Sequence, residues 1–418
     1  MIKAARRTSV ALALLAPIAA IAAGGADARP GPPPPTPIAG TPSEYPARLH
    51  TPSDRSVPPA VSAGSALLVE LDGGGVLFRH AARTRRPVAS LTKVMTALVV
   101  LRATSPDDRV AVPAAAVFGS RDFGAGSTLG LRAGEEQRVR DLLYGALVGS
   151  ANDAARALAI HVSGSEEAFV RRMNRVARDM GMRRTEFRSA TGLDDRGTST
   201  AEDIRVLAEA AASEPLLRRI VMTRVHRLPG PARPRTIQNR NALLWLYPGA
   251  TGMKTGSTRG AGFCLIATAE REGRRLLAVV LGAPSDAFSD AASLLNYGFG
   301  GFDVETVVRA GDPFGEVDLR GGSVEVAASS DLTALVPTVA RDEIHPVIRV
   351  DRSAAFPPAP AEAVGEVQVV AGDLVLGVVP LVPIRVPPPP DGGDLPWWAE
   401  ATGAVARGLG ALVGAFFD

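Results

Sequence analysis

The sequence predicts an α+β protein in which a domain of helices and an antiparallel sheet is followed by a small all-β domain. Apolar residues recur at helical spacing after Ser90, which indicates a buried helix. Two apolar runs, 262–269 and 276–281, are joined by a short polar turn, a pattern typical of central strands in an antiparallel sheet. After Phe302 the long helical patterns stop, and short alternating runs separated by Gly, Pro and Asp replace them.

Residues 1–28 are typical of an export signal. Basic side chains precede an Ala/Leu-rich run over 9–23, and a small-x-small cleavage motif ends at Ala28. The alternative, a transmembrane anchor, fits less well because the apolar run is short and contains Pro17. We therefore expect an exported protein, periplasmic or at the extracytoplasmic face of a bacterial membrane.

Residues 29–61 are rich in Pro and predict an extended linker. The first folded domain is expected over 62–302, and it opens with a β-hairpin whose strands cover 66–71 and 76–79. The apolar positions of the helix after Ser90 are Leu91, Val94, Met95, Leu98 and Leu101.

Further helices follow from periodicity and from their start and stop signals. Phe169 and Met173 share one face, with Gly181 as a stop, and a capping box over 199–202 begins a helix. Short strands are expected over 108–117. The predicted helices span 135–148, 154–162, 165–180, 201–212 and 289–297.

The C-terminal part is predicted to contain a β-sandwich over 303–387, a Pro/Gly linker over 388–394 and a helix over 395–418. A helical wheel of the last segment places apolar side chains on one side and Glu400 and Arg407 on the other. These charges argue against a membrane span, so we expect an amphipathic helix that lies in the membrane surface. A helix docked on the β-domain is the alternative.

Composition excludes several classes of function. Apolar residues make up 46% of the chain, charged residues 21%, and the net charge is only +3. Basic residues are not clustered with aromatic ones, so nucleic acid is not an expected partner. Cys264 is the only cysteine, which rules out an intramolecular disulfide, and the five histidines lack metal-ligand spacing. We expect no metal and no cofactor.

Ser90 and Lys93 form a candidate nucleophile and base. Residues three apart on a helix share a face, so the two side chains can meet. A serine needs a neighbour that takes its proton, and a buried lysine can do so because desolvation lowers its pKa. In the alternative interpretation Ser90 caps the helix and Lys93 extends to solvent.

Two further motifs follow in the chain. Ser150-x-Asn152 lies in the break between two predicted helices, where side chains can point into a cleft, although Ser and Asn are also good helix caps. Lys254-Thr255-Gly256 comes shortly before the predicted central strands. Each motif is weak alone. The set S-x-x-K, S-x-N and K-T-G in this order is that of penicillin-binding proteins and class A β-lactamases.

The stretches 89–98, 141–155 and 247–256 closely resemble low-molecular-weight penicillin-binding proteins, the serine-type D-alanyl-D-alanine carboxypeptidases. The resemblance covers about 62–302 and extends more loosely to the β-domain and the C-terminal helix. It implies a β-lactamase/transpeptidase-like domain, with an antiparallel sheet and a helical subdomain. In two departures, Ser189 stands where the family has Asn, and Thr198 where it has His.

The resemblance implies roles for the catalytic residues. Ser90 would attack the carbonyl between the last two D-alanines of a peptidoglycan stem peptide, and Lys93 would take its proton. Ser150 would relay a proton towards the leaving D-alanine. The N–H groups of Ser90 and Ser257 would hold the oxyanion, and water would release the acyl-enzyme. β-Lactam antibiotics would be covalent inhibitors.

The resemblance also implies the substrate-binding residues. Asn152 would hold the substrate amide, and Lys254 and Thr255 would bind the terminal carboxylate, with Arg240 as a further candidate. Gly256 would allow the substrate to lie along the strand as an added β-strand.

Two other functions are compatible with the motifs. A class A β-lactamase needs an extra Glu after the second motif, but no E-x-x-L-N occurs here, and Glu186 is followed by Phe-Arg-Ser-Ala. The other is a non-catalytic peptidoglycan-binding scaffold, against which the presence of all the catalytic positions argues.

Overall fold

The computed structural model describes residues 57–72, 75–118, 126–230, 234–372 and 374–385. The predicted export signal, most of the linker over 29–61 and everything after 385, including the predicted helix over 395–418, lie outside these ranges. Within them, none of the helices has both the length and the apolar character that a membrane span requires.

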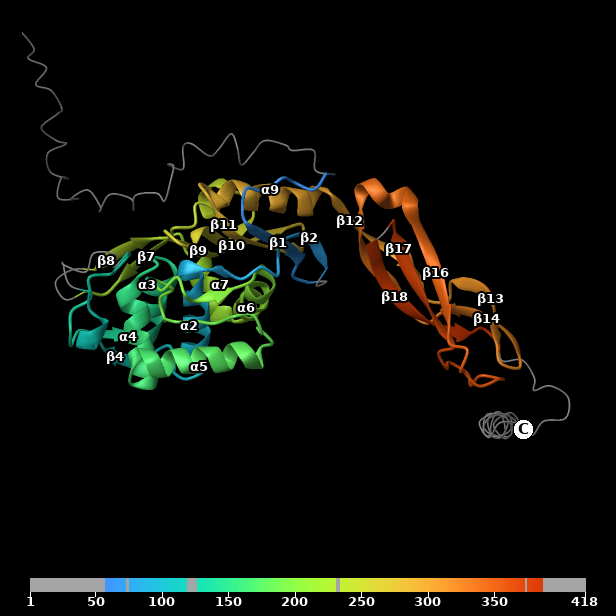
Figure 1. The fold of residues 1–418 in the computed structure, drawn as a ribbon, viewed down its shortest axis with the longest axis horizontal. Coiled ribbons are helices and arrows are strands. Elements are labelled where there is room, and N and C mark those ends of the chain that lie inside the picture. The colour runs from blue at the N-terminus through green and yellow to red at the C-terminus, as the bar shows by residue number, and fades with distance from the viewer. Residues whose placement is uncertain (1–56, 73–74, 119–125, 231–233, 373, 386–418) are drawn as a thin grey trace, which may run out of the picture.

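The first domain is built on a five-stranded antiparallel sheet with the strand order β2-β1-β11-β10-β9 (Figure 1). Its strands are β1 (Ser65–Glu70), β2 (Val76–His80), β9 (Ala250–Thr258), β10 (Gly262–Arg271) and β11 (Arg274–Ala283). In β1, Leu67 and Val69 join the core on one face of the sheet, whereas Ala66 and Leu68 join the core on the other. The predicted hairpin and the predicted central strands are confirmed.

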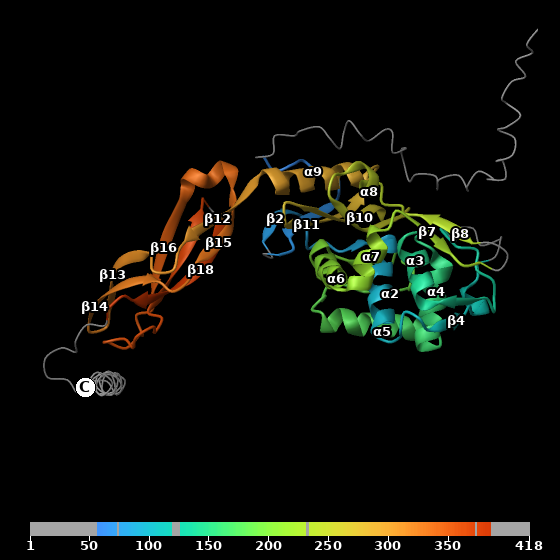
Figure 2. The same ribbon diagram turned by 180° about the vertical axis from the view of Figure 1, so that it is seen from behind.

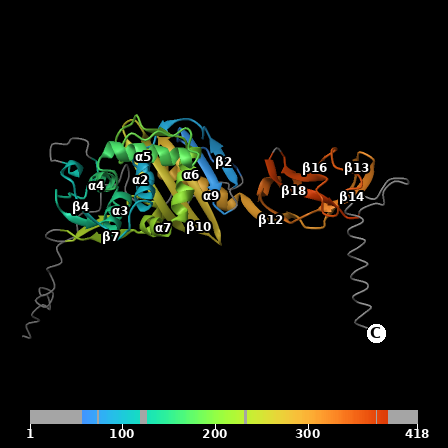
Figure 3. The same ribbon diagram turned by 90° about the horizontal axis from the view of Figure 1, so that it is seen from below.

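Helices cover both faces of this sheet (Figures 1 and 3). Six contribute to the larger core: α2 (Thr92–Leu101), α3 (Val139–Leu147), α4 (Asn152–Ser163), α5 (Glu166–Asp179), α6 (Ala201–Ser213) and α7 (Pro215–Met222). On the opposite face lie α8 (Leu243–Leu246) and α9 (Ala287–Gly300). Helix α2 is buried from Thr92 to Val100, so it runs through the middle of the helical layer. The predicted final helix on the sheet is confirmed as α9.

Several local predictions were wrong. The helix expected from 135 begins only at Val139, because β5 (Glu136–Arg138) pairs with β4 (Arg109–Ala111). The cap of α6 is Thr200 and not Ser199, because Thr200 accepts the Asp203 N–H at 3.1 Å. Of the strands expected over 108–117 only β4 forms, and 3-10 turn η5 (Ala114–Ala116) follows it.

Other elements were not predicted. They are α7, α8, the hairpin of β7 (Val225–Leu228) and β8 (Arg235–Gln238), and the short pair of β3 (Arg86–Pro87) and β6 (Thr198–Ser199). They are short, and their residues show too few periods of apolar alternation to be recognised.

The C-terminal domain is all-β, as predicted. It follows α9 directly through β12 and lies beside the first domain (Figure 2). A two-stranded sheet, β12-β15, accompanies a five-stranded sheet with the order β13-β14-β18-β17-β16. These strands are β12 (Phe302–Val308), β13 (Pro313–Leu319), β14 (Gly322–Ala328), β15 (Leu332–Pro337), β16 (Ile344–Val350), β17 (Gly365–Ala371) and β18 (Leu374–Pro383), with 3-10 turn η6 (Thr338–Glu343). Val326, Val367 and Leu381 are fully buried in a core of its own.

Candidate active site

Ser90 and Lys93 meet at the start of α2. Ser90 lies in 3-10 turn η4 (Ala89–Leu91), and Lys93 lies in the first turn of the helix. The Nζ atom of Lys93 is 2.8 Å from Oγ of Ser90 and donates to the carbonyl of Thr191 at 2.7 Å. The Lys93 side chain is fully buried, and Ser90 makes no helix cap, so the alternative of a capping serine and a solvent-exposed lysine is wrong.

Burial sets the protonation of Lys93. Desolvation, helped by the positive charge of Arg240 and opposed by Asp153, lowers the pKa of Lys93 to about 7. Near neutral pH a large fraction of this amine is therefore uncharged and has a lone pair free. That lone pair is within hydrogen-bond distance of the Ser90 hydroxyl, which is the geometry a general base requires.

The carbonyl that Lys93 contacts belongs to a segment held by two helices. The preceding residue, Ala190, donates its N–H to Glu166 at 3.0 Å, and its carbonyl accepts from Thr96 at 2.7 Å. Thr96 belongs to α2 and Glu166 to α5. The Thr191 carbonyl is thus fixed relative to Lys93, so the amine has little freedom to turn away from Ser90.

The two departures from the family pattern lie on either side of this segment. Ser189 accepts the N–H of Gly192 at 2.8 Å, so its hydroxyl closes the turn locally. Thr198 pairs with Pro87 in the short β3-β6 ladder just before Ser90. Both residues therefore take part in the local structure beside Lys93, Ser189 through its side chain and Thr198 through strand pairing.

Ser150 and Lys254 form a second polar pair. Ser150 lies in the break between α3 and α4, as predicted, and its Oγ accepts from Nζ of Lys254 at 3.0 Å. Lys254 lies on β9, is only 1% exposed and also donates to the Thr255 carbonyl. Desolvation and the charges of Lys93 and Arg240 hold the pKa of Lys254 well below its usual range. The effect of the Lys93 charge on Lys254, together with the contact between Lys254 and Ser150, indicates that the three motifs converge on one centre.

The helix-cap interpretation of Ser150-x-Asn152 is wrong. The N-cap position of α4 is Ala151, and no side chain caps that end. Asn152 is 2% exposed, and its N–H donates to the carbonyl of Ser127 at 2.7 Å.

Arg240 lies beside the same turn, where its Nε donates to the carbonyl of Gly149 at 3.3 Å, and burial lowers its pKa. Thr255 is buried and Ser257 half-buried, both on β9 with Lys254. The predicted site residues thus lie on the second half of β9, at the start of α2 and around the break before α4, and Arg240 reaches that break from the segment after β8.

Gly256 has a steric role that the sequence did not indicate. A Cβ atom added at Gly256 would lie 2.8 Å from the backbone N of Ser90 and 3.1 Å from Cβ of Ala89. Only glycine therefore lets β9 approach the 3-10 turn that carries Ser90 so closely.

Sequence reasoning missed Thr191 and Asp153. Thr191 acts through its carbonyl, which no motif of side chains can reveal. Asp153 directly follows Ser150-x-Asn152, and its carboxylate accepts the N–H groups of Leu129 and Leu131 at 2.9 and 3.1 Å. Its acidic character next to the motif was the available signal.

Comparisons with known proteins agree with this geometry. Residues 52–285 match the family model for D-alanyl-D-alanine carboxypeptidase, Peptidase_S11. The chain is 35% identical over 343 residues to D-alanyl-D-alanine carboxypeptidase DacD of Salmonella typhimurium, covering 78% of this chain and 87% of the relative. It is 32% identical over 294 residues to D-alanyl-D-alanine carboxypeptidase DacF of Bacillus subtilis, covering 66% and 73%. The crystal structure of penicillin binding protein 6B from Escherichia coli aligns with a TM-score of 0.62 and 32% identity, covering 80% of this chain and 98% of that one.

Proposed function

Because this chain belongs to the D-alanyl-D-alanine carboxypeptidase family, we propose that it removes the terminal D-alanine of peptidoglycan stem peptides through an acyl-enzyme on Ser90. It is a serine-type hydrolase of the penicillin-binding class. The alignment to penicillin binding protein 6B covers 80% of this chain, which is more than the first domain alone, so it is consistent with a shared β-domain.

Acylation begins with the Ser90 hydroxyl. Its proton passes to Nζ of Lys93, 2.8 Å away, while Oγ attacks the carbonyl of the penultimate D-alanine. The negative charge that develops on the carbonyl oxygen is held by the N–H groups of Ser90 and Ser257, since charge present only in the transition state gives the largest catalytic benefit. Asn152 holds the substrate amide beside this centre.

Collapse of the tetrahedral intermediate needs a proton on the leaving amine. Ser150 relays to it the proton that Lys93 took from Ser90. The Ser150 hydroxyl lies 3.0 Å from Nζ of Lys254, whose pKa the charge of Lys93 helps to lower. Free D-alanine leaves, and water then attacks the ester carbonyl on Ser90. Lys93 takes a proton from that water and then gives it to Oγ of Ser90 as the ester bond breaks, so that the serine hydroxyl and the neutral amine are both restored.

Recognition of the terminal carboxylate falls to Lys254, Thr255 and Arg240. Without substrate, burial and neighbouring positive charges hold the pKa of Lys254 well below its usual range. An arriving carboxylate adds the opposite charge, so it favours protonation of Lys254 and a charge-assisted hydrogen bond. Gly256 leaves the edge of β9 open to a substrate strand.

The single observation that carries the proposal is the fully buried Lys93 amine 2.8 Å from Ser90 Oγ. The test measures D-alanine release from a diacyl-D-Ala-D-Ala peptide together with labelling by a fluorescent penicillin. Wild type should release D-alanine and retain the label, and Ser90→Ala should do neither. Labelling of Ser90→Ala would refute the assignment of the nucleophile. A wild type that binds peptidoglycan but neither releases D-alanine nor takes the label would instead indicate the scaffold function.

The location and the C-terminal segment are part of the same proposal. A peptidoglycan substrate places the enzyme outside the cytoplasm, as the signal-like residues 1–28 also suggest. We further propose that 395–418 binds the outer face of the cytoplasmic membrane as an amphipathic helix, on its sequence pattern alone, since it lies outside the described residues. Cell fractionation with and without 395–418 tests this, and equal release of both forms would contradict it.

A further inference from the structure

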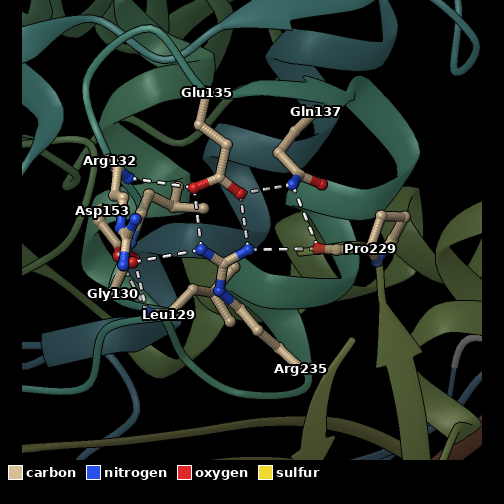
Figure 4. Close-up of polar contacts among 9 residues, drawn as sticks. Leu129, Gly130, Arg132, Glu135, Gln137, Asp153, Pro229 and Arg235 are labelled. Carbon is tan, nitrogen blue, oxygen red and sulfur yellow. Dashed lines mark hydrogen bonds and ion pairs between the residues drawn. The ribbon is translucent and has the colours of Figure 1, made fainter. Parts of the chain in front are cut away.

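Outside the three motifs, Glu135 and Arg235 form a largely buried ion pair. Arg235 donates to both carboxylate oxygens of Glu135 at 2.6 and 2.8 Å, and the two side chains are 17% and 8% exposed (Figure 4). Gln137 donates to Glu135 at 2.7 Å and to the carbonyl of Pro229. Burial alone would raise the pKa of Glu135, but these hydrogen bonds and the Arg235 charge lower it, so the carboxylate stays ionised.

One side of the ion pair holds the segment 127–131. Arg235 donates to the carbonyl of Gly130 at 3.2 Å. The adjacent N–H groups of Leu129 and Leu131 both point at the Asp153 carboxylate, as Figure 4 shows for Leu129. The N–H of Asn152 donates to the carbonyl of Ser127 at 2.7 Å. This segment therefore links Arg235 to the first turn of α4.

The other side of the ion pair holds the turn before Ser150. Arg235 opens β8, and Ile237, two residues along that strand, packs beside Gly149. Arg240, two residues after the strand ends, donates to the Gly149 carbonyl at 3.3 Å. Arg235 thus supports the turn 149–152 from both sides, through Gly130 on one side and through the β8 strand on the other.

This turn needs external support. Ser150 has a φ of +58°, a left-handed conformation that a residue with a side chain rarely adopts. Such a conformation persists only where the surroundings hold it, and a small displacement of a catalytic group reduces its rate strongly. The Oγ of Ser150 must stay near Lys254, 3.0 Å away, for a proton relay.

We propose that Glu135 and Arg235 are positioning residues that keep Ser150 and Asn152 in their reactive geometry, a role that rests on the proposed function. They contact neither substrate nor nucleophile, and they act through Gly130 and the β8 strand. Their loss lowers the acylation rate by displacing the turn, beyond what the loss of a buried ion pair elsewhere in the domain would do.

A second ion pair provides a matched control. Arg274 and Glu70 lie 2.9 Å apart with 18% and 8% exposure, nearly the burial of Arg235 and Glu135. They are on β11 and β1, and Arg274 also donates to the carbonyls of Gly298 and Phe302, so the contacts of this pair do not include residues 149–152. Breaking this pair costs stability without touching the turn 149–152.

The experiment compares Glu135→Gln with Glu70→Gln. The measurements are the rate constant of acylation by a fluorescent penicillin, kcat and KM for a diacyl-D-Ala-D-Ala peptide, and the melting temperature. We expect similar losses of melting temperature, an acylation rate and a kcat about tenfold or more lower in Glu135→Gln, and rates within about twofold of wild type in Glu70→Gln. Equal rates in the two variants would overturn the inference.

Arg235→Lys serves if Glu135→Gln does not fold. It keeps the charge but loses the planar fork that reaches both Glu135 and Gly130, so acylation should still fall. A wild-type acylation rate in this variant would overturn the inference. The swap Glu135→Arg with Arg235→Glu restores an ion pair but removes the donor to Gly130, so it should recover melting temperature and not rate. Full recovery of the rate would overturn the role of that contact. If wild type itself is not acylated the proposed function fails as well, whereas an acylated wild type with an unaffected Glu135→Gln contradicts this inference alone.

Discussion

The first domain and the C-terminal domain differ in what they bury. Among the residues that the structure describes, every buried polar or charged side chain lies between Ser65 and Asp290. The buried side chains of the C-terminal domain are all apolar. Lys93 and Lys254 are among the largest fully buried side chains in the described part of the chain. Burying an amine is unfavourable unless it has partners. The first domain bears this cost because its chemistry requires it, and the C-terminal domain does not.

The two most buried ion pairs of the described residues lie in the first domain, although that domain also has exposed pairs such as Arg109–Glu136. The pairs Glu135–Arg235 and Glu70–Arg274 are largely buried, whereas Arg341–Asp303 in the C-terminal domain has side chains 54% and 52% exposed. Exposed pairs contribute little to stability. The C-terminal domain therefore depends on its apolar core, and we expect changes in the two domains to have separable effects on activity and stability.

The largest expected effect is on the buried polar centre. Because the nucleophile and the base act as a unit, Ser90→Ala and Lys93→Ala should each lower the acylation rate roughly 10³-fold or more, and the double variant should lose little more. Single-turnover labelling with a fluorescent penicillin measures this, and melting temperatures check the fold. If the losses multiply in the double variant, the two side chains act independently.

The next effect concerns the C-terminal core. Leu381 is fully buried there, and Leu381→Ala should destabilise this domain by about 2–5 kcal/mol through the lost contacts and the cavity. Acylation by penicillin should be unchanged below the melting temperature. The control is Leu277→Ala, at a fully buried position in the sheet of the first domain, which should lower both the stability of that domain and the acylation rate. A slower acylation in folded Leu381→Ala would show that the domains are coupled.

These expectations depend on how much of the fold the sequence revealed. Long periodic segments were predicted well: α2, α5, β10 and β11 have enough apolar repeats to fix both type and face. The elements that were missed are short, and the one that was misassigned forms a strand because a partner strand pairs with it. Residues 136–138 continue a helical pattern, but they form β5 because β4 supplies a partner strand.

The candidate site was predicted from motifs, and the resemblance supplied the roles of its residues. The spacing of Ser90 and Lys93 implied a contact that the structure contains. The supporting contacts could not be predicted. The Thr191 carbonyl acts through backbone, and Arg235 lies far along the chain from Glu135, so only the tertiary fold brings them to the site.

A smaller effect concerns the charge of Lys254. Its hydrogen bond to a substrate carboxylate should be worth roughly 1.5–3 kcal/mol. Lys254→Ala should therefore discriminate poorly between a peptide with a free carboxylate and its C-terminal amide, whereas wild type should prefer the free acid. The ratio of kcat/KM for the two peptides is the measurement. A variant that keeps the full preference would assign carboxylate recognition to other residues, with Arg240→Gln as the comparison.

The smallest effect is a shift in pH dependence, and it tests whether the buried charges interact. The pKa of Lys93 is about 7, so acylation should rise with pH through this region as the amine loses its proton and can accept that of Ser90. The positive charge of Arg240 contributes to this low pKa by disfavouring protonated Lys93. Arg240→Gln should therefore raise the pKa and move the midpoint of the acylation profile to higher pH, even if substrate binding weakens.

The same linkage applies to stability. Between pH about 7 and the ordinary lysine value of 10.5, the unfolded chain binds more protons at Lys93 than the folded one does. The penalty for burying Lys93 is therefore largest below pH 7 and declines as the pH rises towards 10.5. Because Arg240→Gln raises the pKa of Lys93 in the folded protein, it should reduce this penalty at low pH. Arg274→Gln is the control: it removes an arginine that does not act on Lys93, so the midpoint of its acylation profile should be that of wild type. Profiles of acylation rate against pH for the three proteins decide the matter, and an identical midpoint in wild type and Arg240→Gln would mean that the charge of Arg240 does not reach the catalytic amine.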